Sequence, residues 1–204
     1  MMQRGSAQGT CLLLYGAPRC IPGQNFTKGA SSLIREHRSR EKLESYYEKF
    51  TEEGILDPNV HPWVAASWQQ SRALGVPREK MSTEKRFSPE EFHRLQAKHE
   101  DAIAYLMKLS EGIREFFQEY NLSLLLIDAD CVVLKSYSLP FYQMTPGEIE
   151  GARVGVEEVG TSSISVAYEH QTPFWMFGPE MWVKECQLGD AYTAPVKING
   201  ECQY

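Results

Sequence analysis

Apolar residues recur three and four positions apart, without a break, from Phe92 to Tyr120. This period matches one face of an α-helix and the a/d seam of a coiled coil. Ser88, Pro89 and Glu91 form a capping-box sequence that predicts the start of the helix. We therefore expect one long helix over 88–120, whose seam consists of Phe92, Leu95, His99, Ala102, Leu106, Leu109, Ile113, Phe116 and Tyr120.

This seam has two interpretations that the sequence leaves open. A 3.5-residue repeat packs two helices together, so the pattern predicts a homodimer through the 89–120 helix. The alternative is that the same apolar face packs on the sheet of its own domain.

Beyond Asn121 the pattern changes to that of strands. The run Leu122–Ile127, apolar except for Ser123, predicts a buried strand, Asp128–Asp130 a turn, and Cys131–Leu134 a returning strand. Further strands are expected over 172–177 and 191–198, with short helices over 160–168 and from 178, and a hairpin turn at 199–200. Helices that precede strands with short inserted helices predict an α+β fold.

The region before the long helix divides into two parts. Residues 1–32 carry scattered glycines and prolines, and we expect a flexible leader that need not be native to the domain. Residues 33–87 predict an N-terminal helical segment, with an exposed charged helix up to about Phe50 and a second helix from Pro62 to Leu74. Residues 88–204, including the long helix, form the main expected domain.

Composition and charge limit the function classes. The net charge of −6 argues against a general nucleic-acid surface, which should be basic. The five cysteines are odd in number and show no C-x-x-C spacing, which favours free thiols in a reducing cytoplasm. The apolar run Cys11–Tyr15 is too short for a signal-peptide core or a membrane span. We therefore expect a cytoplasmic protein without membrane contact.

Four segments carry a resemblance to a known family. They are 64–76 (VAASWQQSRALGV), 126–134 (LIDADCVVL), 157–164 (EEVGTSSI) with Ala167, and 191–196 (AYTAPV). In this order they resemble the N-terminal GAF sensor of sigma-54-dependent transcription activators of the acetoin and glycerol catabolism type. The resemblance implies a GAF-like antiparallel sheet flanked by helices, with an N-terminal helical extension.

The chain also departs from that family. Cys131 stands where the hairpin has a glycine, so a positive φ is costly at this position. Met181 and Trp182 follow Glu180 where the family has a histidine. The family continues past its turn at 199–200 into further strands, so the last strand of the sheet must be absent, replaced or supplied by a continuation. The sequence contains neither a Walker motif nor a helix-turn-helix pattern.

The resemblance implies a regulatory sensor that is not an enzyme. A small-molecule effector would bind in a GAF pocket, and helices would relay its binding to an ATPase and DNA-binding output that is not in this chain, which itself makes no direct nucleic-acid contact. One alternative is a thiol-dependent redox enzyme of the GAF-like free methionine sulfoxide reductase kind, using Cys131, Cys186 and Cys202. Another is a GAF-like dimerisation module without a ligand.

The expected ligand pocket lies between the sheet and residues 160–178. Aromatic rings would supply its area and hydroxyl groups would orient a flat or cationic ligand. Its expected ligand-binding residues are Phe141, Tyr142, Thr161, Ser162, Trp175, Phe177, Trp182 and Tyr192. No histidine pair has metal-ligand spacing and no carboxylate pair forms a convincing acid/base couple, so we expect no metal, no cofactor and no catalytic residue.

Overall fold

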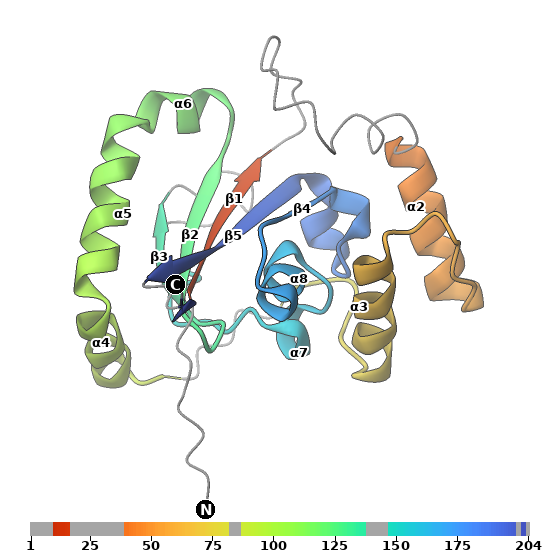
Figure 1. The fold of residues 1–204 in the computed structure, drawn as a ribbon, viewed down its shortest axis with the longest axis horizontal. Coiled ribbons are helices and arrows are strands. Elements are labelled where there is room, and N and C mark those ends of the chain that lie inside the picture. Colours follow the sequence, from red (N-terminus) through yellow and green to blue (C-terminus); the bar gives the residue numbers. More distant parts are fainter. Residues whose placement is uncertain (1–9, 17–38, 82–86, 138–146, 199–200, 203–204) are drawn as a thin grey trace, which may run out of the picture.

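The computed structural model describes residues 10–16, 39–81, 87–137, 147–198 and 201–202. Figure 1 shows an antiparallel sheet between two groups of helices. The strand order is β3-β2-β1-β5-β4, and β6 pairs with β5. The strands are β1 (Thr10–Gly16), β2 (Ser123–Ile127), β3 (Val133–Tyr137), β4 (Phe174–Met176), β5 (Asp190–Ile198) and β6 (Glu201–Cys202). The predicted α+β class is confirmed, as is the buried strand at Leu122–Ile127.

The strand β1 lies in the middle of the sheet, between β2 and β5. Leu13 is opposite Leu125 on one side and Thr193 on the other, and both pairings are antiparallel. The expectation of a flexible leader is therefore wrong for residues 10–16, while the rest of 1–32 lies outside the described residues. The apolar run Cys11–Tyr15 is too short to span a membrane, but it is long enough to form a strand of the sheet.

One face of the sheet is covered by the N-terminal helices and by the short helices of the C-terminal half (Figure 1). They are α2 (Arg40–Glu48), the π-helical turn η1 (Lys49–Glu53), α3 (Pro62–Ala73), α7 (Val156–Val159), α8 (Ser163–His170), η3 (Gly178–Glu180) and η4 (Lys184–Leu188). Ser39 caps α2, and Ser162 caps α8 as part of a capping box. Both predicted N-terminal helices and the short helices are therefore present within the described residues. The first was expected to be exposed, but α2 buries Leu43 and Tyr47, because these two side chains lie on its inward face.

A single apolar core joins these helices to the sheet. It runs from Tyr47 and Trp68 on the N-terminal helices to Leu125 and Ala191 on the strands. The division expected at residue 87 therefore does not correspond to a break in the core. Residues 39–81 are part of the same folded unit as the sheet.

Two tryptophans tie the helices to the loop around η3. The Trp68 indole Nε1 donates to the carbonyl of Glu180 at 2.7 Å, and the Trp182 Nε1 donates to the carbonyl of Val76 at 2.8 Å. The Tyr47 hydroxyl donates to the carbonyl of Trp182 at 2.7 Å. Burial raises the pKa of Tyr47 to about 12, so this hydroxyl stays a donor at neutral pH.

The opposite face of the sheet is covered by the helices of the predicted seam. The single helix expected over 88–120 is instead three: α4 (Pro89–Lys98), α5 (Glu100–Gly112) and α6 (Arg114–Glu119). The predicted capping box at Ser88 is present. The breaks fall at His99 and Ile113, where φ is −117° and −126°, outside the helical range.

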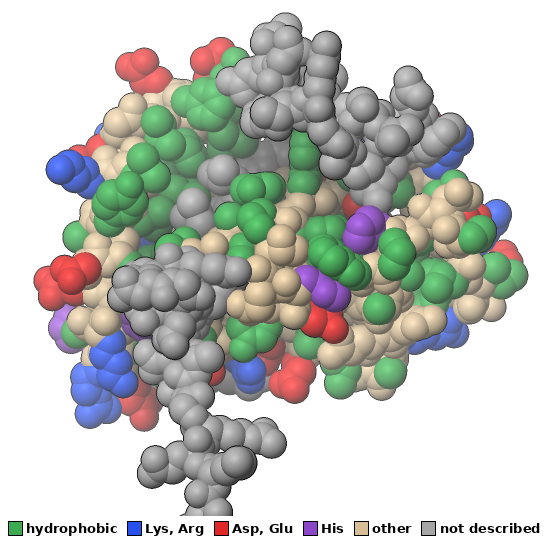
Figure 2. Space-filling model, viewed as in Figure 1, with side chains coloured by type: hydrophobic (Ala, Val, Ile, Leu, Met, Phe, Trp, Pro, Cys, Tyr) green, Lys and Arg blue, Asp and Glu red, His purple; other side chains and the backbone are tan. Residues whose placement is uncertain are grey.

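The seam is divided between the sheet and the surface. Leu106 is 3% exposed and packs with Leu124, Leu126 and Leu134 of the sheet. Four apolar side chains of α5, the following break and α6 stay exposed, namely Tyr105, Leu109, Ile113 and Phe116. Figure 2 shows apolar side chains gathered on this side of the molecule. The intramolecular interpretation therefore holds for the part of the seam around Leu106.

Candidate functional site

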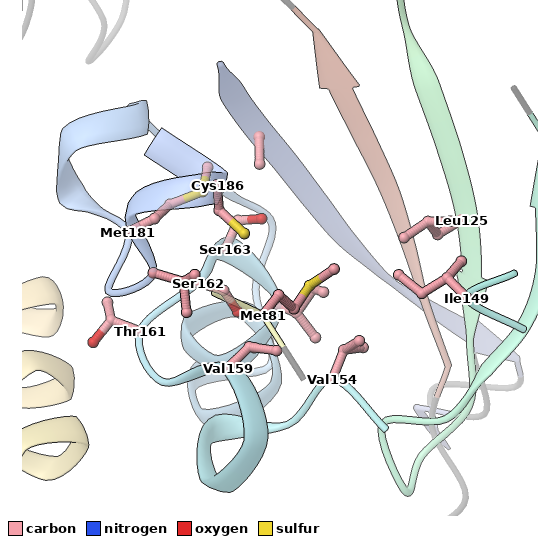
Figure 3. Close-up of a pocket in the computed structure, with 13 residues that line it drawn as sticks. Met81, Leu125, Ile149, Val154, Val159, Thr161, Ser162, Ser163, Met181 and Cys186 are labelled. Atoms are coloured by element: carbon pink, nitrogen blue, oxygen red, sulfur yellow. The ribbon is translucent and has the colours of Figure 1, made fainter. Parts of the chain in front are cut away.

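A small buried cavity lies between the sheet and the helices α7 and α8 (Figure 3). Leu125 of β2 and Ala191 of β5 form its sheet side, and Val159 of α7 and Ile164 of α8 face them. Met181, from the loop after η3, adds a flexible wall. The cavity measures about 40 Å³. That volume holds only a few water-sized groups.

The hydroxyl groups at the edge of the cavity already have partners. The Thr161 hydroxyl points toward α3 (Figure 3) and lies 3.0 Å from the Ser71 hydroxyl. The Ser163 hydroxyl lies 2.7 Å from that of Thr193. The Ser162 hydroxyl accepts from the backbone N–H of Ser165 as the cap of α8. No charged side chain lines the cavity within the described residues.

The loop that carries Thr161 and Ser162 depends on Gly160. Its φ is +65°, and a Cβ built there would lie 2.6 Å from the Trp182 ring. Only glycine tolerates both the backbone angle and this close approach. The packing of the Trp182 ring therefore sets the position of the polar edge of the cavity.

The eight predicted site residues divide into four groups. Thr161 and Ser162 line the cavity. Trp182 does not line it, because its ring is 3% exposed and packs edge-on to Tyr47 and Phe50 in the core. The rings of Trp175, Phe177 and Tyr192 do not line the cavity either. The last two predicted residues, Phe141 and Tyr142, lie outside the described residues.

The expectation that these rings wall one pocket is not met, because strand alternation turns two of them outward. Trp175 is 47% exposed between two buried neighbours on β4, Phe174 and Met176. Tyr192 is its direct partner on β5 and is 40% exposed. Phe177 stacks on Trp175 with ring centroids 5.5 Å apart. Successive residues of a strand point to opposite faces, so Trp175 and Tyr192 lie on the face opposite the cavity.

Most residues that line the cavity were not predicted from the sequence. Met81, Ile149 and Val154 come from segments between the regular elements and converge on it in Figure 3. Isolated aliphatic residues in loops show no period, so no local signal marks them. Strand alternation could have separated the side chains of β4 into two faces, because Phe174 and Met176 are buried on one face and Trp175 between them is exposed on the other.

The two cysteines with described side chains do not face a common site. Cys186 lines the buried cavity, whereas Cys131 lines a separate cleft. Burial raises the pKa of Cys131 to about 11, so its thiol is neutral at physiological pH. Redox catalysis needs an attacking thiolate with a resolving thiol close to it. This arrangement provides neither.

The turn between β2 and β3 holds Cys131 in an unusual conformation. Its φ is +60°, so the cysteine adopts the angle that the sequence marked as costly. The carboxylate of Asp128 accepts hydrogen bonds from the backbone N–H groups of Asp130 (3.0 Å) and Val132 (2.8 Å). Burial raises the pKa of Asp128 to about 6. Asp128 is therefore committed to the turn and is not half of an acid/base pair with Asp130.

Among the residues that the structure describes, no group of three or more histidine, cysteine, aspartate or glutamate side chains is arranged to hold a metal ion. In the same part of the chain, none of the helices is both long and apolar enough to cross a membrane. In comparisons with known proteins, the chain matches no family model, no curated protein and no solved structure.

Proposed function

We propose that the chain is a small-molecule-sensing regulatory domain of the GAF type, from a bacterial transcription activator. The observation that carries the proposal is that two of the four family-like segments line the cavity and the other two lie next to it. Segments 157–164 and 191–196 contribute Val159, Thr161 and Ala191 to its lining. Segment 126–134 continues the strand of Leu125, and segment 64–76 reaches the cavity edge through Ser71.

The lining indicates the class of ligand. Its walls are aliphatic and sulfur-containing, and its hydroxyls already have partners within the protein. A charged ligand would lose its hydration without gaining a counter-ion. We infer a small, uncharged and largely apolar effector, instead of the flat or cationic ligand that the aromatic residues suggested.

The small volume couples binding to a change of shape. A ligand of more than a few heavy atoms fits only if the walls move, and those walls belong to both sheet and helices. Binding would then favour a wider state by at most its differential affinity for the two states. The helices would relay this shift to an output module outside these 204 residues. The domain would act in the cytoplasm without touching DNA itself.

Thermal unfolding with matched four-carbon probes tests the ligand site. We expect 2-butanol and 2-butanone to raise the Tm, because a ligand of the native state stabilises it by mass action, whereas the anion butyrate does not. Ala191→Val, which fills the cavity, should remove the shift. Ala194→Val is the matched control on the same strand, because it does not line the cavity.

The outcomes separate the proposal from its alternatives. A shift that persists in Ala191→Val, or one caused only by butyrate, contradicts the assignment of the site. If none of the three probes changes the Tm, the interpretation as a dimerisation module without a ligand is favoured. Turnover of methionine sulfoxide with a thiol reductant would support the redox enzyme instead.

We further propose that the chain forms a homodimer through the exposed part of the seam. Leu106 packs on its own sheet, so the contact would use the exposed seam residues Leu109, Ile113 and Phe116, with Tyr105 beside the seam. Leu109→Glu is expected to halve the mass in sedimentation equilibrium with the fold intact. Leu188→Glu, at a more exposed leucine on η4, should leave the mass unchanged. A wild-type monomer at high concentration contradicts the dimer.

A further inference from the structure

A second void, an open cleft of about 350 Å³, lies on the surface beside the candidate site. Its walls come from the β2–β3 turn, the segment 153–155, α7, α8 and one residue of α3. Its volume is within the range of small-molecule sites, unlike that of the buried cavity. Residues of three of the four family-like segments line the cleft, namely Gln70, 129–131 and 157–158.

The rim of the cleft is acidic. Asp130 of the turn, Glu157 of α7 and Glu169 of α8 are exposed at its edge, and Glu158 lies deeper, with its side chain 7% exposed. Arg153 is the single cation among the lining residues, which leaves a formal charge of −3. Walls of one charge sign concentrate oppositely charged solutes, because a cleft focuses the field.

Arg153 neutralises only part of this charge. Its Nε donates to the carbonyl of Asp130 at 2.9 Å, which fixes the guanidinium beside the turn. Its Nη1 lies 3.8 Å from Glu157 and 3.7 Å from Glu158. At these distances this nitrogen does not hydrogen-bond to either carboxylate. The pairs are therefore loose, and a second cation can approach the rim.

The floor of the cleft has a different character from its rim. Ala129 and Cys131 are each 8% exposed there, and Val156 lies beside them. The Cys131 thiol has no hydrogen-bond partner among the described residues, although it is more than nine-tenths buried. A buried thiol and two aliphatic side chains offer a surface that suits an alkyl chain.

We propose that this cleft binds a small alkyldiamine. Its two ammonium groups lie among the carboxylates of Asp130, Glu157 and Glu169, and the alkyl chain between them lies on the floor formed by Ala129, Cys131 and Val156. The site is separate from the buried cavity, so it provides the domain with a second input of opposite chemical character. Because each ligand reaches its own void, the two bind without competing for space.

Isothermal titration calorimetry with three four-carbon probes tests the proposal. We expect 1,4-diaminobutane to bind at least about tenfold more tightly than the uncharged 1,4-butanediol, and more weakly as salt is added. Succinate should not bind. If 1,4-diaminobutane shows no binding, or succinate binds in its place, the proposal is wrong.

Three variants locate the site. The double variant Glu157→Gln with Glu169→Gln should weaken diamine binding at least about tenfold, because it removes two charges from the rim. Arg153→Gln should strengthen binding, since it removes the internal competitor, whereas an anion site would lose its ligand. Glu111→Gln, on the exposed face of α5, is the control for net charge. If Glu111→Gln weakens binding as much per charge as the rim variants, the amine does not bind in the cleft.

Discussion

Replacing Trp68 by alanine is expected to lower the free energy of unfolding by about 3–5 kcal/mol, the usual cost of truncating a fully buried large aromatic side chain. The side chain is 0% exposed in the middle of α3. Its ring stacks on Phe50 at 5.6 Å and meets the edge of Tyr47 at 5.6 Å. Its loss would leave a void between the N-terminal helices and the sheet and would remove the hydrogen bond to the Glu180 carbonyl.

Chemical denaturation followed by circular dichroism measures this loss. Trp68→Phe keeps most of the ring volume but removes the hydrogen bond to Glu180, so it should cost less than the alanine variant, about 1–3 kcal/mol. Trp175→Ala is the matched control, because that tryptophan is 47% exposed, and it should cost less than about 1 kcal/mol. Equal losses for Trp68→Ala and Trp175→Ala would contradict the described core.

Leu13→Pro is expected to destabilise the protein by at least about 2 kcal/mol, because proline removes a backbone donor from a strand that is paired on both sides. The residue sits opposite Leu125 of β2 and Thr193 of β5. Proline is tolerated at the edge of a sheet but not in its middle. The expected result is therefore specific to a central strand.

The same denaturation experiment separates a strand from a leader. Leu13→Val keeps the backbone donor and a strand-forming side chain, so it should retain most of the stability. If Leu13→Pro unfolds at the same denaturant concentration as the wild type, residues 10–16 are not part of the sheet. The expectation of a flexible leader would then hold for this segment too.

The sequence predicts elements whose signal is local. The run Leu122–Ile127 is apolar except for Ser123 because β2 is buried on both faces, so its burial could be predicted without knowing its neighbours. The cap at Ser88 is equally local. The strand β1 contains a similar apolar run, Cys11–Tyr15, but the scattered glycines and prolines of residues 1–32 favoured a leader over a strand.

The helical seam shows where periodicity stops being informative. The period predicts a face that includes Leu106, and Leu106 is buried. It does not show that the helix breaks at Ile113, where the non-helical backbone shifts the inward position by one residue. Phe117 is therefore 1% exposed, and the predicted Phe116 is 42% exposed.

A cavity lies between the sheet and residues 160–178, where the sequence predicts a pocket, but only Thr161 and Ser162 of the predicted residues line it. The helix start at Ser162 could be predicted because glycine, threonine and serine mark it. The sequence predicts the rings of Trp175 and Tyr192 in the wall of the pocket, but it does not show which face of the sheet each ring occupies. Met81 and Met181 were missed because they lie in loops without a period.

Methyl NMR of the protein labelled at its seven methionines tests the central claim most directly. The Met81 and Met181 methyl groups belong to residues that line the cavity, whereas Met107 lies on α5 across the sheet. During titration with 2-butanol, we predict that the signals of Met81 and Met181 shift together and saturate, and that the signal of Met107 stays in place. A saturating shift at Met107 alone, or no saturating shift at Met81 and Met181, would contradict a ligand site between the sheet and α8.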